Sequence, residues 1–274
     1  MRISVIEPIG FCSGVRRAVD LFKQILKTRS ERPIYVLHEL VHNRSVSEQM
    51  KRQGACFVEH ISEVPNGSVI LLGAHGCGLD VEEECKSRNL VVFDAVCPLV
   101  KQLQKTASNY KTDLPLVLLG DKSHPEVQSV INRAQGRQIF VVEHENDALP
   151  RLDAALLLSQ TTRNAAEVER VRAKLEQCIG SLESRANVCN AVLLRQKAVE
   201  ELSRQCDLML IIGSRHSANA TRLLEIASAN TRAFMVETAD DIQPQWLENV
   251  RHVGVGAGTS TPDSDIKEVL EKLK

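Results

Sequence analysis

The sequence predicts an α/β protein made of three similar lobes, each with a small, mainly parallel sheet and flanking helices, related by a pseudo-threefold axis around a central site. Apolar, strand-like runs alternate with helix-period segments along the whole chain, a pattern typical of parallel sheets joined by crossover helices. In addition, the strand-to-helix turn at Cys12 has counterparts at Cys97 and Cys189, at nearly equal intervals. Such self-similarity indicates an internal repeat.

A second landmark lies at the same place in each repeat. The string FVEH at 57–60 is echoed by VVEH at 141–144 and by MVET at 235–238. If the three copies close around one axis, each contributes a thiol from the same position. The predicted lobes are residues 14–97, 98–188 and 189–274.

About four strand-like runs are expected in each third of the chain. They are 3–7, 34–37, 57–58 and 69–73; then 90–93, 116–120, 140–143 and 155–158; and last 208–213, 234–236 and 252–256, with a weak candidate at 185–188. The segment after Cys12 is predicted to be helical, because Val15, Ala18, Phe22 and Ile25 recur with helical spacing.

Composition excludes several partners. The 274 residues are 43% hydrophobic with a net charge of −1, so no broad basic face favours nucleic acid or a membrane surface. No apolar run approaches the ~20 residues that span a bilayer, and the N-terminus resembles no signal or transit segment. We therefore expect a cytoplasmic protein whose eight cysteines are thiols or metal ligands rather than disulfides.

The three repeated cysteines leave three interpretations open. Cysteine is often a buried packing residue, although packing gives no reason for it to recur before the first helix of each repeat. A structural zinc site prefers four ligands in close pairs, which are absent here, whereas a catalytic zinc with three ligands stays open. A 4Fe–4S cluster held by three thiolates would leave one iron available to substrate. Cys77 could approach such a centre from its loop; the others are expected to be packing residues (Cys56, Cys85, Cys178 and Cys206).

Polar side chains gather in the loops that follow the predicted strands, where parallel sheets bind ligands. Three histidines, two serines and an asparagine could cradle an oxyanion or diphosphate without a Lys/Arg cluster: they are His42, His75, His124, Ser217, Asn219 and Ser260. Each histidine could equally be structural.

Glu126 is the best candidate proton donor in these loops, provided that a dry pocket raises its pKa. Its alternative role, next to Pro125, is to favour the first turn of a helix. Thr161 and Thr162 could orient a substrate hydroxyl or a proton relay; alternatively, they cap the helix that begins near Asn164.

These motifs resemble those of the 4-hydroxy-3-methylbut-2-enyl diphosphate reductase (LytB) family over essentially the whole chain. The matching strings, in order, are GFCSGV, HELVHNR, AHG, FDAVCPLV, SHPEV, SQTT, RQKAV, GSRHSAN and AGTSTP. Any one of them would be a weak signal, but their shared order is a strong one.

The resemblance implies a cloverleaf of three α/β lobes around a 4Fe–4S cluster with one open iron, ligated by Cys12, Cys97 and Cys189. It also implies that the N-terminal segment 1–13 joins the sheet of the third lobe. The diphosphate would be held by His42, His75, His124, Ser217, Asn219 and Ser260, with Thr161 also touching substrate.

The resemblance further implies that the allylic hydroxyl binds the open iron and that Glu126, with Thr161, supplies protons. Two electrons, expected from a ferredoxin or flavodoxin, and two protons then remove the hydroxyl as water, which yields isopentenyl and dimethylallyl diphosphates.

The chain departs from the family pattern at three hydroxyl positions. Val96, Val192 and Ala218 stand where the family usually has hydroxyl-bearing residues. Losing a hydrogen bond to a charged group costs about 1.5–3 kcal/mol. The alternative function is therefore that of a divergent relative, which keeps the open-iron cluster and performs reductive or hydrolytic chemistry on another small molecule. A non-enzymatic redox or iron sensor is a third interpretation, which Glu126 and Thr161 disfavour because a sensor needs no proton donor.

Overall fold

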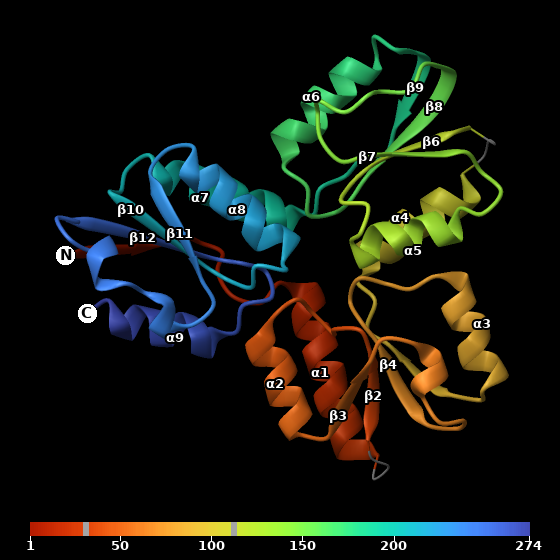
Figure 1. The fold of residues 1–274 in the computed structure, drawn as a ribbon, viewed down its shortest axis with the longest axis horizontal. Coiled ribbons are helices and arrows are strands. Elements are labelled where there is room, and N and C mark those ends of the chain that lie inside the picture. Colours follow the sequence, from red (N-terminus) through yellow and green to blue (C-terminus); the bar gives the residue numbers. More distant parts are fainter. Residues whose placement is uncertain (30–32, 111–113) are drawn as a thin grey trace. The chain divides into compact units, whose positions relative to one another are not determined.

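Three four-stranded parallel sheets form the framework of the protein in a computed structural model that describes residues 1–29, 33–110 and 114–274 (Figure 1). The first sheet, of order β3-β2-β4-β5, contains β2 (Ile34–Leu37), β3 (Ala55–Val58), β4 (Val69–Leu72) and β5 (Val91–Asp94). The second, β7-β6-β8-β9, contains β6 (Leu116–Leu119), β7 (Ile139–Val142), β8 (Leu152–Ser159) and β9 (Ile179–Ser184). The third, β1-β12-β10-β11, contains β1 (Arg2–Val5), β10 (Leu208–Ile212), β11 (Arg232–Val236) and β12 (His252–Ala257).

Helices connect the strands, as parallel pairing requires. They are α1 (Ser13–Thr28), α2 (Arg44–Arg52), α3 (Leu79–Ser87), α4 (Pro98–Asn109), α5 (Pro125–Arg133), α6 (Ala165–Leu175), α7 (Asn190–Ser203), α8 (Ala218–Ser228) and α9 (Asp263–Lys272). Short 3₁₀ helices are η1 (Ile61–Glu63), η2 (Ala239–Asp241) and η3 (Pro244–Trp246). Within the described parts of the chain, no helix combines the length and apolarity needed to cross a membrane.

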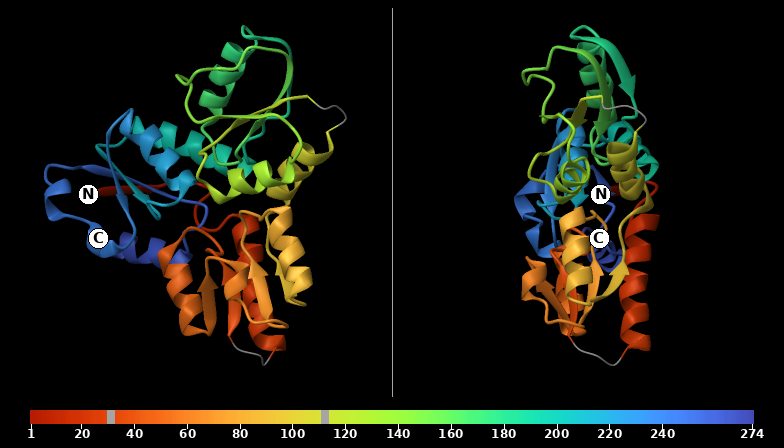
Figure 2. Two further views of the ribbon diagram at one scale, coloured as in Figure 1. Left: turned by 45° about the vertical axis from the view of Figure 1, so that its right-hand side comes forward. Right: turned by 90° about the vertical axis from the view of Figure 1, so that its right-hand side faces the viewer.

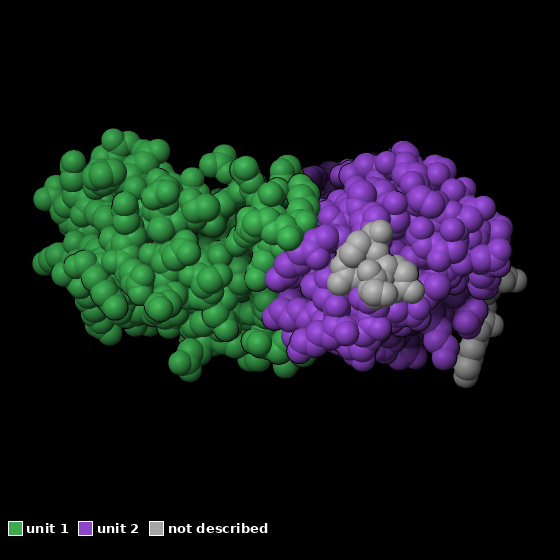
Figure 3. Space-filling view, turned by 90° about the horizontal axis from the view of Figure 1, so that it is seen from below, with its two compact units in different colours: residues 1–16, 41–52, 190–274 green, residues 17–40, 53–189 purple. Residues whose placement is uncertain are grey.

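The contacts divide the chain into two compact units (Figure 3). Unit 1 consists of residues 1–16, 41–52 and 190–274 and holds the third sheet. Unit 2 consists of residues 17–40 and 53–189 and holds the first and second sheets. The lobe boundaries at 14–97, 98–188 and 189–274 stay a prediction.

The internal repeat predicted from FVEH, VVEH and MVET is visible in the turns that those strings form. The two successive amides of residues 59–60, 143–144 and 237–238 donate to the carboxylates of Glu63, Asp147 and Asp241, at 2.7–3.0 Å. The same turn thus follows the equivalent strand of each sheet.

Most of the predicted strands are present, with two corrections. The run at 90–93, assigned to the second third of the chain, is β5 and pairs with β4 in the first sheet. The weak candidate at 185–188 is wrong: those residues are irregular, and the fourth strand of the second sheet is β9. The expected pairing of the N-terminal strand with the third sheet is confirmed by β1, which pairs with β12.

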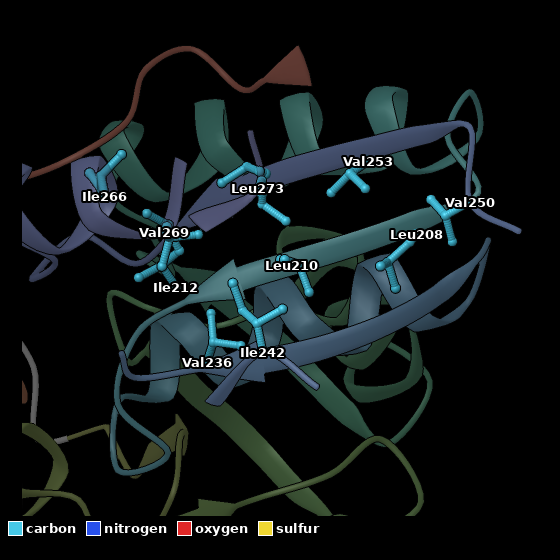
Figure 4. Packing of buried hydrophobic residues seen from close by; sticks show 12 residues of the cluster. Leu208, Leu210, Ile212, Val236, Ile242, Val250, Val253, Ile266, Val269 and Leu273 are labelled. Carbon is cyan, nitrogen blue, oxygen red and sulfur yellow. The ribbon is translucent and has the colours of Figure 1, made fainter. Parts of the chain in front are cut away.

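The core of unit 1 uses both faces of β10. Leu208, Leu210 and Ile212 pack with Val269 of α9 on one face (Figure 4). The intervening residues of the strand pack against α7 and α8 on the other face. Because β10 is buried on both faces, it is apolar at every position.

Replacing Leu210 by alanine is expected to lower the free energy of unfolding by about 2–5 kcal/mol, because the side chain is fully buried and its removal leaves a cavity. Urea unfolding monitored by circular dichroism measures this change. Leu194→Ala is the matched control, since 45% of Leu194 is exposed, and it should shift the curve far less.

In unit 2, α4 joins the cores of the two sheets. Val100 packs in the cluster of the first sheet, whereas Leu103 and Ala107 pack in that of the second. Helices α4 and α5 lie side by side (Figures 1 and 2). Between them, Gln104 of α4 donates to the hydroxyl of Ser129 of α5 at 2.9 Å. This packing positions α5, whose N-cap is His124 and whose first turn contains Glu126.

Candidate functional site

The three repeated cysteines are held in the same way. The amide of each donates to the carbonyl of the second residue beyond the third strand of a repeat, at 2.9–3.0 Å. The pairs are Cys12 with Thr259, Cys97 with Ala74, and Cys189 with Thr161. Because one backbone bond fixes each thiol relative to a sheet edge, the three positions are structurally equivalent.

Each of these cysteines also stands at the start of a helix. Cys97 is the N-cap of α4, with Pro98 as the first helical residue, and Cys12 and Cys189 immediately precede α1 and α7. The amide of Val15 donates to the Cys12 sulfur at 3.4 Å, and N–H groups of this kind stabilise an anionic ligand at a helix N-terminus.

The donor set fits a thiolate-bound metal centre. All three thiols are partly exposed, and the eight cysteines, all of which lie in the described residues, form no disulfide. Cys12 belongs to unit 1, and Cys97 and Cys189 belong to unit 2, so the meeting of the three sulfurs stays a prediction.

The remaining cysteines are less suited to binding metal. Cys77, expected as a possible approach to the centre, is buried with Val96 and Val100 in the core of the first sheet. Burial raises the pKa of its thiol to about 12, which keeps it protonated. Cys85 is 1% exposed in the same core, in agreement with its expected packing role.

His124 and Glu126 are arranged by the first turn of α5. His124 is the N-cap, and its Nδ1 accepts the amide of Glu126 at 3.1 Å. In the neutral ring the proton therefore lies on Nε2, which can donate. The ring of His75 packs edge-on against that of His124, with 5.3 Å between centroids. The rings of His75 and His124 thus lie together in unit 2, and His124 bonds to the backbone of the residue that carries the buried carboxyl group.

Glu126 is paired with Thr161, as a proton relay requires. One carboxyl oxygen accepts the amide of Thr161 at 2.6 Å, and the other accepts its hydroxyl at 2.9 Å. Only 1% of Glu126 is exposed. Burial raises the pKa of Glu126 to about 7, against the lowering effect of the two bonds from Thr161. A carboxyl with this pKa can both hold and release a proton near neutral pH.

This raised pKa makes stability depend on pH. Below about pH 4.5 Glu126 is neutral in folded and unfolded chains alike; as pH rises through its folded pKa of about 7, the stabilising effect of the neutral form is lost. Between about pH 4 and about pH 8, the free energy of unfolding of the parent protein should therefore fall by about 3 kcal/mol relative to that of Glu126→Gln. Paired urea unfolding curves at the two pH values test this, and an unchanged difference would contradict it.

The candidate residues of unit 1 form a second polar group. Ser217 is the N-cap of α8 and accepts the amide of Ala220 at 3.4 Å. The hydroxyl of Ser260 donates to the carbonyl of His42 at 3.0 Å. Asn219 is 2% exposed, and among the residues that the structure describes neither the nitrogen nor the oxygen of its side-chain amide has a hydrogen-bond partner. A buried amide without partners is costly, and a bound oxyanion or hydroxyl would satisfy it.

Sequence reasoning missed Arg163. This side chain is 1% exposed and forms ion pairs with Asp121 at 2.9 Å and with Glu167 at 2.7 Å. It thereby ties the loop before α5 to the start of α6. No sequence signal separates an arginine that is buried in this way from one on the surface.

Thr162 does not cap α6. The N-cap is Asn164, whose side chain accepts the amides of Ala166 and Glu167, and the hydroxyl of Thr162 accepts from Gln160 at 3.1 Å. Gln160 is fully buried and also accepts the amide of Asp121 at 2.9 Å. The SQTT string therefore builds a loop in which Thr161 alone bonds to Glu126.

Two of the three departures from the family pattern are apolar and buried. Val96 is 4% exposed, and Val192 is 2% exposed. Ala218 is the first residue of α8, next to Ser217. Each leaves a position near the candidate site without a hydroxyl.

The fold consists of three parallel sheets, with an equivalent thiol before a helix of each repeat and a buried carboxyl group whose pKa is raised to about 7. These features define an α/β protein with thiols and an acidic group at the carboxyl ends of its strands. Residues 3–274 match the model of the LytB protein family. The chain belongs to this family, for which an iron–sulfur cluster is implied.

Named relatives agree over the full chain. A 4-hydroxy-3-methylbut-2-enyl diphosphate reductase of Actinobacillus succinogenes is 38% identical over 284 residues, which cover 100% of this chain and 90% of the relative. The reductase structure from Plasmodium falciparum matches with a TM-score of 0.90 and 29% identity, over 98% of this chain and 87% of that one. A further structure, of the terminal enzyme of the non-mevalonate pathway, matches with a TM-score of 0.70 and 30% identity, over 100% and 99% of the two chains.

Proposed function

We propose that this protein removes the allylic hydroxyl of 4-hydroxy-3-methylbut-2-enyl diphosphate by reduction, as the last step of an isoprenoid pathway. The identity of full-length relatives with that name supports the substrate. The observation that carries the chemistry is the buried Glu126–Thr161 pair, because this reduction consumes protons as well as electrons.

Cys12, Cys97 and Cys189 are proposed to ligate a 4Fe–4S cluster, with one thiol held by a backbone bond at the edge of each of the three sheets. When bound, the cluster supplies electrons one at a time and, at an iron without a protein ligand, a Lewis acid for the substrate oxygen. The equivalent backbone bonds of the three cysteines support this ligand set. A ferredoxin or flavodoxin in the cytoplasm is the proposed source of electrons.

Glu126 and Thr161 are proposed to deliver the protons that the reaction consumes. The allylic alcohol of the substrate, two electrons and two protons become the dehydroxylated diphosphate and water, so one proton joins the leaving hydroxyl and the other adds to a carbon of the allyl group. Glu126 is neutral below its pKa of about 7 and can give its proton directly or through Thr161. The products would be isopentenyl and dimethylallyl diphosphates.

The diphosphate is proposed to be bound by neutral donors. They are His42, His75, His124, Thr161, Ser217, Asn219 and Ser260. The N-termini of α5 and α8, where His124 and Ser217 are the N-caps, add backbone N–H groups and the positive end of a helix dipole.

Asn219→Ala is expected to raise KM for the diphosphate by about 10- to 100-fold, because a hydrogen bond to a charged group contributes about 1.5–3 kcal/mol. Steady-state kinetics under anaerobic conditions measure the change, and kcat should fall much less. Asn230→Ala is the control, since Asn230 bonds to Ser203 and Ile226 at the far end of α8. An unchanged KM for Asn219→Ala would remove this residue from the site.

One anaerobic preparation tests the function. Iron and sulfide analysis should give about four of each per chain, and a dithionite-mediator assay should show dehydroxylation of the diphosphate. Colourless protein with one zinc would contradict the cluster. An intact cluster without activity would favour the second candidate, a divergent relative that acts on another small molecule by reductive or hydrolytic chemistry. The missing hydroxyls at Val96, Val192 and Ala218 are the observation that favours it.

A further inference from the structure

Thr161, which bonds to Glu126, also lines a cavity within unit 2. Its volume is about 340 Å³, and it lies between the outer side of α4 and the segment that follows β9. Most of its wall is polar but uncharged: Gln102, Thr106, Ser159, Thr161, Ser184 and Asn187. A polar space of this size holds several water molecules, each with protein partners.

The wall offers little to an ionic ligand. Arg185 is its one charged residue among the described residues, and this guanidinium is engaged with Tyr110, over the ring at 5.8 Å and by a hydrogen bond to the hydroxyl at 3.4 Å. No carboxylate or histidine lines the described wall. Water suits this space better than a charged metabolite.

Glu126 needs a supply of protons that it cannot draw from solvent by itself. The side chain is 1% exposed, and both of its carboxyl oxygens face Thr161. One carboxyl group holds one proton, but the proposed reaction consumes two in each turnover. Glu126 must therefore be reprotonated during the cycle, by a group that reaches both the carboxylate and water.

We propose that this cavity is the proton entrance of Glu126, with the Thr161 hydroxyl as its inner end. A water in the cavity gives a proton to Thr161 Oγ1, while the hydroxyl proton of Thr161 passes to the Glu126 carboxylate. The hydroxyl gains one proton and loses one, and the water is restored from solvent. This role rests on the proposed function for its use in turnover, but the route itself is a property of the resting protein.

Asn187 and Ser159 hold the inner part of the entrance in shape. The hydroxyl of Ser159, at the end of β8, accepts the amide of Asn187 at 3.0 Å, and both residues line the cavity beside Thr161. They are positioning residues, because they neither touch Glu126 nor exchange protons at neutral pH. Their bond keeps the segment after β9 near Thr161, so that water has room beside the hydroxyl.

Filling the cavity tests the route. Ala186→Phe and Thr106→Phe place a ring in the space from two different walls, so that one remains informative if the other fails to fold. Ala166→Phe is the control, because Ala166 is exposed on α6 and is not part of the cavity wall. Crystal structures of the variants would verify that the ring occupies the cavity.

The first measurement uses the resting, cluster-loaded protein. After transfer to D2O at a pH where Glu126 is protonated, infrared spectroscopy follows the exchange of its carboxyl proton, and the band is assigned by its loss in Glu126→Gln. Exchange should slow by about tenfold or more in both filled variants and stay at the parent rate in Ala166→Phe. Parent-rate exchange with the ring seen in the cavity would overturn the proposal.

The second measurement is turnover. The filled variants should lose about tenfold in kcat with KM unchanged, a smaller loss than removal of the acid itself. A rise in KM alone would mean that the cavity touches the substrate, and it would overturn the entrance. If exchange slows but the parent protein reduces no allylic diphosphate, the proton route stands and the proposed function fails.

Discussion

Glu126→Gln should lower kcat by about 10²–10⁴-fold and leave the iron content unchanged. Glutamine keeps the size of the side chain and can still accept the Thr161 amide, which now bonds to the carboxyl at 2.6 Å, but it has no acidic proton to give. The measurement is anaerobic turnover normalised to bound iron. The control is Glu169→Gln, because Glu169 lies exposed on α6 with its carboxylate paired to Arg172, and this variant should keep full activity.

The pH profile supplies a second signature of the same residue. Burial raises the pKa of Glu126 to about 7, and a general acid acts in its protonated form, so kcat/KM should fall as the pH rises through this value. This fall in kcat/KM should be absent from the pH profile of the residual activity of Glu126→Gln. Full turnover by that variant, or a parent profile that rises through this range, would remove Glu126 from the role of acid.

The parts of the fold that the sequence predicts well are the strands buried on both faces. β10, Leu208–Ile212, is apolar at every position and fully buried, so its pattern is unambiguous. The sequence does not indicate β9, Ile179–Ser184, because this strand lies at the edge of its sheet with four of its six residues exposed. Its two apolar residues, among glycine, serine and glutamate, give no strand pattern. The pairing and burial of this strand depend on residues far along the chain.

In the candidate site, too, the sequence indicates some residues but not the properties that burial gives them. The sequence indicates Glu126 because it is the only glutamate besides Glu39 in the polar loops that follow the predicted strands. Its raised pKa, however, results from burial to 1% exposure, which exists only after folding, and so does the hydrogen bond that it accepts from Thr161 of a distant loop. Arg163 could not be found at all, since its buried ion pairs with Asp121 and Glu167 exist only after folding. Sequence thus predicts which groups are available, and the fold decides their protonation.

Cys189→Ser is expected to abolish stable cluster binding. A serine hydroxyl is far weaker than a thiolate as a ligand of iron, and a cluster with three protein ligands has none to spare. The backbone bond from the Cys189 amide to the carbonyl of Thr161, at 2.9 Å, does not depend on the side chain, so the loop should keep its place while the iron is lost. Iron, sulfide and visible absorption, measured anaerobically, report the loss directly.

A matched cysteine separates loss of a ligand from loss of the fold. Cys178 is also partly exposed and lies in unit 2, but it follows α6 rather than preceding a helix at the carboxyl edge of a sheet. Cys178→Ser should therefore keep about four irons per chain when Cys189→Ser keeps almost none, with both variants folded by circular dichroism. If Cys189→Ser retained its full iron, the equivalence of the three backbone bonds would reflect the repeat alone, and the ligand set would have to be sought elsewhere.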